Sequence, residues 1–155
     1  MRAYDIVSHV RVYDWDELPP SDKELVELAQ QALRGSYAPY SQFHVGAALR
    51  TSGGHLVMGS NQENPASPSS LCAERVALYA ANAQYPDEAV EAIALAAFTR
   101  GEYTSYPIVP CGACRQVMSG IRQRYGQPIR ILLYGADGTH VVDDIDALLP
   151  LQFSL

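Results

Sequence analysis

The sequence predicts an α/β protein in which helices cover a mixed central sheet, as a three-layer αβα sandwich. Three observations lead to this prediction. Segments whose apolar residues have helical spacing are interleaved with segments that alternate with a period of two. Residues 90–98 are almost entirely apolar, as a central strand buried on both faces would be. The chain has 155 residues and no composition change that marks a linker, so we expect one domain over residues 1–155.

The first part of the chain predicts an arm and a helix. Residues 8–15 alternate loosely between apolar and polar side chains, so they are expected to form a short strand or an extended arm. Residues 21–24 have the form of a capping box, with Ser21 as the cap and Glu24 three residues later. An apolar stripe with a 3.6-residue period follows and ends at Gly35, which predicts a helix between Ser21 and Gly35.

The rest of the chain predicts a hairpin, a loop and alternating helices and strands. Residues 43–51 and 55–60 alternate with a period of two and are joined by a Gly-Gly turn, which is typical of a β-hairpin. Residues 61–70 are polar and contain two prolines, which predicts a loop suited to binding a ligand. The remaining expected elements are a helix over 71–83, a strand over 90–98, a helix over 111–125, strands over 130–134 and 139–142, and a short helix over 144–149.

The composition excludes several classes of function. Hydrophobic residues make up 48% of the chain and charged residues 18%, which is enough for a core and too little charge for disorder. The formal net charge of -6 argues against a protein that holds the phosphate backbone of nucleic acids. No apolar run approaches the ~20 residues that span a bilayer, and the charged N-terminal segment argues against a signal peptide. We therefore expect a cytoplasmic protein with neither a nucleic-acid nor a membrane partner.

Three cysteines, Cys72, Cys111 and Cys114, predict a metal site. Each stands where a loop becomes a helix, so the helix dipole favours its ionised form. Three thiolates that converge from two helix N-termini make a zinc site, and three protein ligands leave the fourth position for water, as in catalytic zinc. Two alternatives stay open. A redox-active Cys-x-x-Cys pair would leave Cys72 unused, and a structural zinc would need a fourth Cys or His nearby.

Glu74, two residues after Cys72, indicates the class of reaction. Zinc lowers the pKa of a bound water from 15.7 to about 7. A neighbouring carboxylate that does not bind the metal can take the proton of this water and deliver it later. The alternative is that Glu74 only complements the helix dipole. Its combination with Cys72 and the distant Cys-x-x-Cys favours the proton-transfer interpretation.

The pattern Cys72-Ala73-Glu74 followed by Pro110-Cys111-Gly112-Ala113-Cys114 resembles the zinc deaminases that act on nucleobases. Within that group, the ordered motifs resemble the small three-cysteine cytidine deaminases over about residues 23–153. This resemblance implies a cytidine deaminase-like fold, a homotetramer with shared active sites, and an N-terminal arm (residues 1–20) outside the common core. The matching motifs are residues 37–48 (YAPYSQFHVGAA), residues 61–64 (NQEN), residues 71–75 (LCAER), and the ending with Leu148-Leu149-Pro150 and Phe153.

The resemblance also implies a role for each matched residue near the metal. The three cysteines would bind Zn²⁺, and Glu74 would move protons. Arg75 would donate to the thiolate sulfurs, since three thiolates on a dication leave a net negative charge. Considered without the family, Arg75 would be a surface arginine.

The same resemblance implies a set of substrate-binding residues. Phe43 would stack on the pyrimidine, and Asn61 and Glu63 would hold the ribose 3′-hydroxyl. Ala73 would also contact the substrate, and Phe153 would cover the base in a neighbouring subunit's site. Considered without the family, Phe43 would be a core residue and Asn61 a turn residue.

These motifs predict a zinc-dependent enzyme of pyrimidine salvage that converts cytidine or deoxycytidine to uridine or deoxyuridine and ammonia. Two alternatives stay open: a deaminase of another aminopyrimidine nucleoside such as blasticidin S, and a non-catalytic zinc or nucleoside-binding protein on the same scaffold. The presence of Phe43 and of Asn61 with Glu63 favours ordinary cytidine. Glu74 counts against a non-catalytic protein. Two residues depart from the family pattern: Ser67 stands where relatives have Tyr, and Ser70 where they have Gly.

Overall fold

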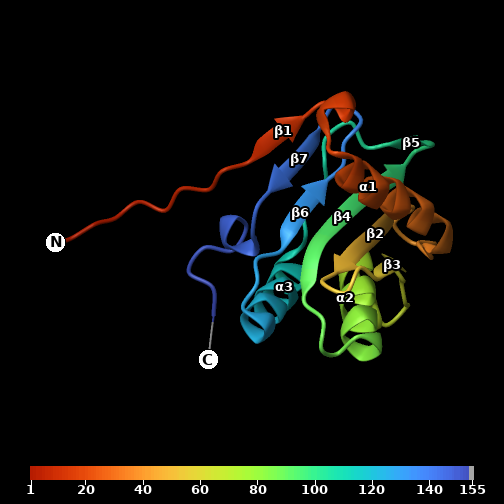
Figure 1. The fold of residues 1–155 in the computed structure, drawn as a ribbon. Coiled ribbons are helices and arrows are strands. Elements are labelled where there is room, and N and C mark those ends of the chain that lie inside the picture. Colours follow the sequence, from red (N-terminus) through yellow and green to blue (C-terminus); the bar gives the residue numbers. More distant parts are fainter. Residues whose placement is uncertain (154–155) are drawn as a thin grey trace.

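The computed structural model describes residues 1–153. Its strands form one mixed seven-stranded sheet (Figure 1). The strand order is β1-β7-β6-β4-β2-β3, and β5 pairs with β4 beside this path. β4 and β6 run parallel, and the other neighbouring pairs are antiparallel. In chain order the strands are β1 (Arg11–Tyr13), β2 (His44–Thr51), β3 (Leu56–Ser60), β4 (Val90–Thr99), β5 (Glu102–Tyr103), β6 (Arg130–Leu133) and β7 (Thr139–Val142).

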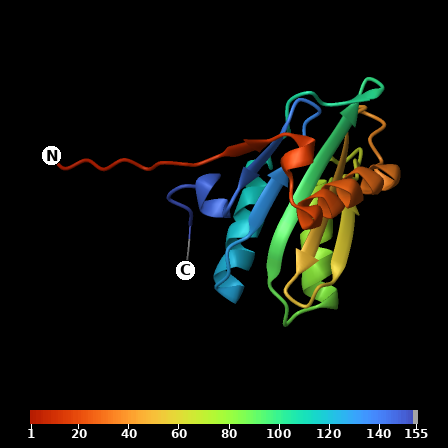
Figure 2. The same ribbon diagram turned by 45° about the horizontal axis from the view of Figure 1, so that its top comes forward.

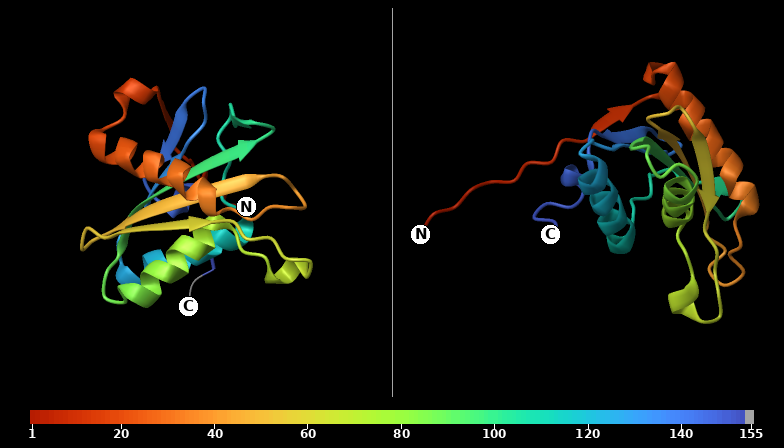
Figure 3. Two further views of the ribbon diagram at one scale, coloured as in Figure 1. Left: turned by 90° about the vertical axis from the view of Figure 1, so that its right-hand side faces the viewer. Right: turned by 60° about the horizontal axis from the view of Figure 1, so that its bottom comes forward.

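Helices cover both faces of the sheet, so the predicted three-layer αβα sandwich is confirmed (Figure 3). The helix α1 (Pro20–Ala32) packs on one face, and α2 (Ala73–Gln84) and α3 (Gly112–Tyr125) pack on the other. The described residues also form short 3₁₀ helices, namely η1 (Trp15–Glu17), η2 (Leu33–Gly35), η3 (Ser67–Ser69) and η4 (Ile145–Ala147).

The central strand β4 contributes side chains to the hydrophobic cores on both faces of the sheet. Ala92, Ala94 and Ala96 belong to the cluster under α1, whereas Ile93 and Leu95 belong to the cluster under α2 and α3. Successive side chains of a strand point to opposite faces, so burial on both faces requires the nearly unbroken apolar run that the sequence shows.

Glycine on two strands lets the helices approach the sheet closely. A Cβ added to Gly46 on β2 would lie 2.0 Å from the Ala29 carbonyl oxygen of α1. A Cβ added to Gly59 on β3 would lie 2.5 Å from the Ala73 carbonyl oxygen of α2. The second contact matters for function, because it seats the first turn of α2, which follows Cys72, directly on the sheet.

The start of α1 differs from the prediction. Pro19 is its N-cap residue and Pro20 its first residue, so the predicted cap at Ser21 is wrong. Proline suits the first helical position because the missing N–H would have no intrahelical partner there. A capping box occurs one element earlier, at η1, where the Asp14 N–H donates to Glu17 Oε2 at 2.9 Å. The periodic stripe continues past the end of α1 as η2, which ends at Gly35.

Several other boundaries shift by one or two residues. α2 and α3 begin one residue after Cys72 and Cys111, because these cysteines are the N-cap residues. The polar loop contains the 3₁₀ turn η3, the expected last helix is the shorter η4, and β5 was not predicted.

A strand and an arm are both present at the N-terminus: β1 pairs with β7, and residues 1–10 extend away from the sheet (Figure 2). None of the helices in the described part of the chain has the length and apolar character that a membrane span requires.

Candidate zinc centre and adjoining cavity

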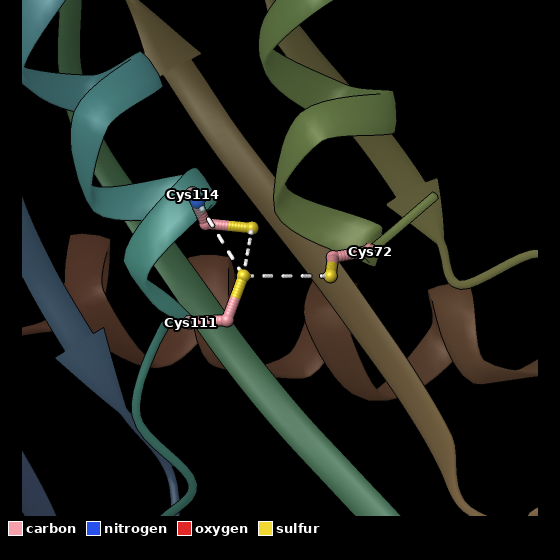
Figure 4. Close-up of side chains that lie close together, drawn as sticks. All are labelled: Cys72, Cys111 and Cys114. Atoms are coloured by element: carbon pink, nitrogen blue, oxygen red, sulfur yellow. Dashed lines mark hydrogen bonds between the residues drawn. The ribbon is translucent and has the colours of Figure 1, made fainter. Parts of the chain in front are cut away.

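Two helix N-termini bring the three cysteines together (Figure 4). Cys72 caps α2 and Cys111 caps α3, while Cys114 lies in the first turn of α3. Both helices pack on the same face of the sheet, so their N-terminal ends meet at one place. The side chains of all three cysteines point toward a common centre (Figure 4).

The three sulfur atoms form a triangle with the dimensions of a zinc site. Cys72 Sγ lies 3.8 Å from Cys111 Sγ, and Cys111 Sγ lies 3.4 Å from Cys114 Sγ. A tetrahedral zinc with Zn–S bonds of about 2.3 Å places its sulfur ligands about 3.8 Å apart. Within residues 1–153, these cysteines are the one group of three or more metal-binding side chains that converges in this way. The donor set and its spacing therefore fit zinc with one position left for water.

Contacts within the cluster favour negative charge on Cys72. The neighbouring Cys114 thiol lowers the pKa of Cys72 to about 5, and Arg75, whose Nη2 lies 3.7 Å from Cys72 Sγ, adds to this effect. The same contact with Cys72, together with burial, raises the pKa of Cys114. Arg75 therefore faces the cluster rather than open solvent, and its Nε has no hydrogen-bond partner among the described residues.

Glu74 is buried beside the cluster. Its exposed fraction is 3%, and burial is the main cause that raises the pKa of its carboxyl to about 7. Burying a carboxyl costs free energy, so a glutamate that only complemented a helix dipole would be expected in solvent. The side chain instead lines the cavity in front of the sulfurs, where it can exchange protons with a bound molecule.

A cavity of about 640 Å³ opens in front of the cysteine cluster. Every predicted site residue lines it except Phe153 and the fully buried Cys114. Phe43 lines the cavity, and its partly buried ring also packs against the hydrophobic core. The predicted site residues in the lining are Phe43, Asn61, Glu63, Cys72, Ala73, Glu74, Arg75 and Cys111.

Asn61 is held at the wall of this cavity by the start of β2. Its Oδ1 accepts a hydrogen bond from the Val45 N–H, and its Nδ2 donates to the Phe43 carbonyl oxygen, both at 2.8 Å. These two bonds fix which end of the amide is the acceptor. One Nδ2 hydrogen remains for a ligand, because the amide group has two.

Glu63 is held by the neighbouring turn. Its Oε2 accepts hydrogen bonds from the Tyr40 N–H at 2.8 Å and the Ser41 N–H at 3.3 Å. The Ser41 side chain and the Tyr40 N–H lower the pKa of the Glu63 carboxyl, which keeps it ionised near neutral pH. Its other oxygen, Oε1, has no hydrogen-bond donor among residues 1–153 and can accept a hydrogen bond from a ligand.

Phe153 lies outside the cavity of its own chain. It is 67% exposed, and its carbonyl oxygen accepts a hydrogen bond from Gln123 Nε2 at 3.3 Å. The two departures from the family pattern, Ser67 and Ser70, line the cavity, and Ser70 Oγ accepts a hydrogen bond from the Asn64 N–H. The structure therefore leaves the predicted role of Phe153 in a neighbouring subunit's site untested.

One cavity wall was not predicted from the sequence. It consists of the segment before α3, whose side chains Pro107, Ile108 and Val109 join Cys111 in the lining. The signal that could have identified this wall is the apolar run that leads directly into the Cys-x-x-Cys motif.

Three convergent cysteine side chains that could hold zinc with one position left for water, together with a buried carboxyl in the adjoining cavity, are the features of a zinc-dependent hydrolytic enzyme. The family model "Cytidine and deoxycytidylate deaminase zinc-binding region" matches residues 19–125. The chain therefore belongs to this family of zinc-dependent deaminases, and the three cysteines form its zinc-binding cluster.

Individual relatives agree with this assignment. The chain is 45% identical to a cytidine deaminase of Halalkalibacterium halodurans over 95 residues, which are 61% of this chain and 67% of that protein. A crystal structure of cytidine deaminase from Burkholderia pseudomallei matches with a TM-score of 0.70 and 39% identity, covering 84% of this chain and 97% of that one. A blasticidin-S deaminase of Bacillus cereus is 28% identical over 86% of this chain and 92% of its own length.

Proposed function

We propose that this member of the family deaminates free cytidine and deoxycytidine, releasing ammonia and uridine or deoxyuridine. The observation that carries the proposal is the buried carboxyl of Glu74 beside three convergent thiols. The same cavity is lined by the aromatic ring of Phe43, the amide of Asn61 and the carboxylate of Glu63. Zinc bound by Cys72, Cys111 and Cys114 would supply a Lewis acid that makes water acidic enough to act as a nucleophile near neutral pH.

Glu74 would carry the protons of the reaction. Its carboxylate accepts a proton from the water that adds to C4 of the pyrimidine and delivers this proton to N3. It then passes the proton of the new C4 hydroxyl to the 4-amino group. The C4–N4 bond breaks with its electron pair on nitrogen, so ammonia leaves as the C4 carbonyl forms. A carboxyl with a raised pKa is suited to both directions of transfer.

Asn61 and Glu63 would recognise the sugar as a complementary pair. Asn61 offers an N–H donor and Glu63 offers the acceptor Oε1, so a single hydroxyl group can accept from the first and donate to the second. The ribose 3′-hydroxyl is such a group. A 3′-phosphate would be repelled by the ionised Glu63, which favours a free nucleoside over a nucleotide within a strand.

The alternative substrates are distinguished by one spectrophotometric assay. We expect turnover of cytidine and deoxycytidine, little turnover of free cytosine, which has no sugar, and none of cytosine within a single-stranded oligonucleotide. Efficient deamination of the oligonucleotide, insensitive to nuclease, would contradict the role given to Glu63. Faster turnover of blasticidin S than of cytidine would favour the alternative supported by the Bacillus cereus relative. A protein that binds zinc and turns over none of these compounds would be the non-catalytic alternative.

We also infer that the protein works as a homotetramer with shared active sites. The support is the resemblance together with Phe153, an exposed aromatic ring that its own cavity does not use. The single domain over residues 1–155, the arm outside the common core and the cytoplasmic setting belong to the same proposal. The cytoplasmic setting rests on the three unpaired thiols, which persist in a reducing compartment.

Replacing Phe153 with alanine tests the shared site. Stacking of a base on an aromatic ring contributes ~1–3 kcal/mol, so the Michaelis constant for cytidine should rise about tenfold while bound zinc is unchanged. The matched control is Tyr4→Ala, which removes an exposed aromatic ring from the arm. Light scattering that shows an active monomer, with kinetics unaffected by Phe153→Ala, would mean that each chain contains a complete site.

A further inference from the structure

A chain of hydrogen bonds lies behind Asn61, on the side away from the ligand. His44 Nδ1 lies 2.9 Å from Ser36 Oγ, and Ser36 Oγ lies 2.5 Å from Asn61 Oδ1. His44 begins β2, and Ser36 follows η2 in the segment that leads from α1 to the cavity. Both residues are partly buried, and neither lines the cavity.

The direction of each hydrogen bond in this chain follows from the donors available. Asn61 Oδ1 is an acceptor, because it receives the Val45 N–H. The Ser36 hydroxyl must therefore donate its single hydrogen to Asn61 Oδ1. Ser36 Oγ then has only lone pairs to offer His44, so His44 must donate from Nδ1. The imidazole of His44 consequently carries a hydrogen on Nδ1.

The backbone around Ser36 holds this geometry in place. The Tyr37 N–H donates to the Asn61 carbonyl oxygen at 3.0 Å, and the Glu63 N–H donates to the Tyr37 carbonyl oxygen at 2.8 Å. Gly35 lets the segment that carries Ser36 lie close to the end of β3, since a Cβ at Gly35 would lie 2.9 Å from Ser60 Oγ. The segment that carries Ser36 is thus paired with the segment that carries Asn61 and Glu63.

This arrangement leaves Asn61 as a pure donor toward the cavity. Both lone pairs of its Oδ1 are used by Val45 and Ser36, and one Nδ2 hydrogen is used by the Phe43 carbonyl oxygen. The remaining Nδ2 hydrogen is the hydrogen-bonding group that Asn61 has left. Donation into Oδ1 polarises the amide, which strengthens this remaining N–H as a donor.

We propose that Ser36 and His44 are positioning residues, which hold and polarise Asn61 for its hydrogen bond to the sugar 3′-hydroxyl. This inference rests on the proposed nucleoside substrate. A purely structural role, in which the two residues only attach the loop to β2, would weaken turnover of every substrate to a similar extent. A role that acts through Asn61 would weaken turnover only of substrates that carry the 3′-hydroxyl.

The test compares cytidine with 3′-deoxycytidine in the zinc-loaded enzyme. Loss of one partly buried hydrogen bond is worth about 1.4 kcal/mol, so Ser36→Ala should lower kcat/KM for cytidine about tenfold, mainly through a higher KM. The same variant should lower kcat/KM for 3′-deoxycytidine by less than about twofold. Ser8→Ala, whose hydroxyl bonds the Ala147 carbonyl oxygen far from the cavity, is the control and should match the parent enzyme on both substrates.

Two variants of His44 complete the test. His44→Leu should reproduce the cytidine-specific loss, because Ser36 then lacks its donor. His44→Asn should keep most of the parent kcat/KM for cytidine, because the amide N–H of asparagine can take the place of Nδ1–H. Equal losses on cytidine and 3′-deoxycytidine, or a Ser36→Ala enzyme as active as the parent, would overturn the inference while the proposed function stands. An unmodified protein with no activity on either substrate would overturn the proposed function and this inference with it.

Discussion

Replacing Glu74 with glutamine is expected to lower kcat for cytidine by about 10⁴-fold. General acid–base groups commonly contribute ~10²–10⁴-fold, and Glu74 would serve several proton transfers in one turnover, which places it at the upper end. Glutamine preserves the size of the side chain and removes the base. Steady-state and single-turnover kinetics at neutral pH would measure the effect.

Zinc content and stability should persist in the Glu74→Gln variant. Glu74 does not bind the metal in this interpretation, and the neutral amide costs less to bury than an ionised carboxylate. The matched control is Glu91→Gln, an exposed β4 side chain that pairs with Arg50 outside the cavity, and its kcat should stay within about twofold of the parent value. If Glu74→Gln retained near-normal turnover, Glu74 would be no more than a charge at the end of a helix.

Replacing Cys111 with alanine should abolish both zinc binding and activity. Only two thiolates would remain, and substitutions of even the residues that support metal ligands cost ~10–100-fold in metal affinity. Cys111 is the informative position because its side chain is exposed, whereas Cys114 is fully buried. Cys111→Ala therefore removes a ligand without opening a hole in the core. Elemental analysis after dialysis should find zinc in the parent protein and almost none in the variant.

Gly112→Ala is the matched control for the loss of a ligand. It changes the next residue of the same turn, and a Cβ there would meet nothing within 4 Å. This control should keep both zinc and activity. A Cys111→Ala protein that retained zinc after dialysis and still deaminated cytidine would exclude the three-thiolate centre, as would an active parent protein that contained no zinc.

Most of the fold follows from short-range patterns in the chain. The apolar run at residues 90–98 identified the strand buried on both faces, and the periodic stripes identified α1, α2 and α3, because burial imposes these spacings on the sequence. The error at the start of α1 arose because two local signals competed. Ser21 and Glu24 have the form of a capping box, yet Pro20 already occupies the first helical position, so the helix begins before the serine. β5 has two residues and pairs only through the end of β4, so no local period could reveal it.

The chemistry of the site was predictable for a similar reason. Cys72, Cys111 and Cys114 stand at loop–helix junctions, and each is an N-cap or first-turn residue in the structure, where helix geometry dictates how the side chain leaves the backbone. Glu74 was identified by its distance of two residues from a ligand. A short covalent spacing within one turn of helix thus places Glu74 beside Cys72 and Cys114 beside Cys111, whereas the packing of α2 and α3 on one face of the sheet brings the two pairs together.

The sequence by itself thus predicted the order of most elements, the layered sheet and the three cysteines that form the zinc-binding cluster, and it singled out Glu74 beside them. Only the tertiary structure decided how those groups are surrounded. The wall of Pro107, Ile108 and Val109 and the hydrogen bonds from His44 through Ser36 to Asn61 join segments that no local period connects. Such contacts depend on how closely α1, the hairpin and the loop before α3 pack on the sheet. That packing is set by the sum of many side-chain volumes and by backbone approaches such as those at Gly46 and Gly59, and no single motif encodes it.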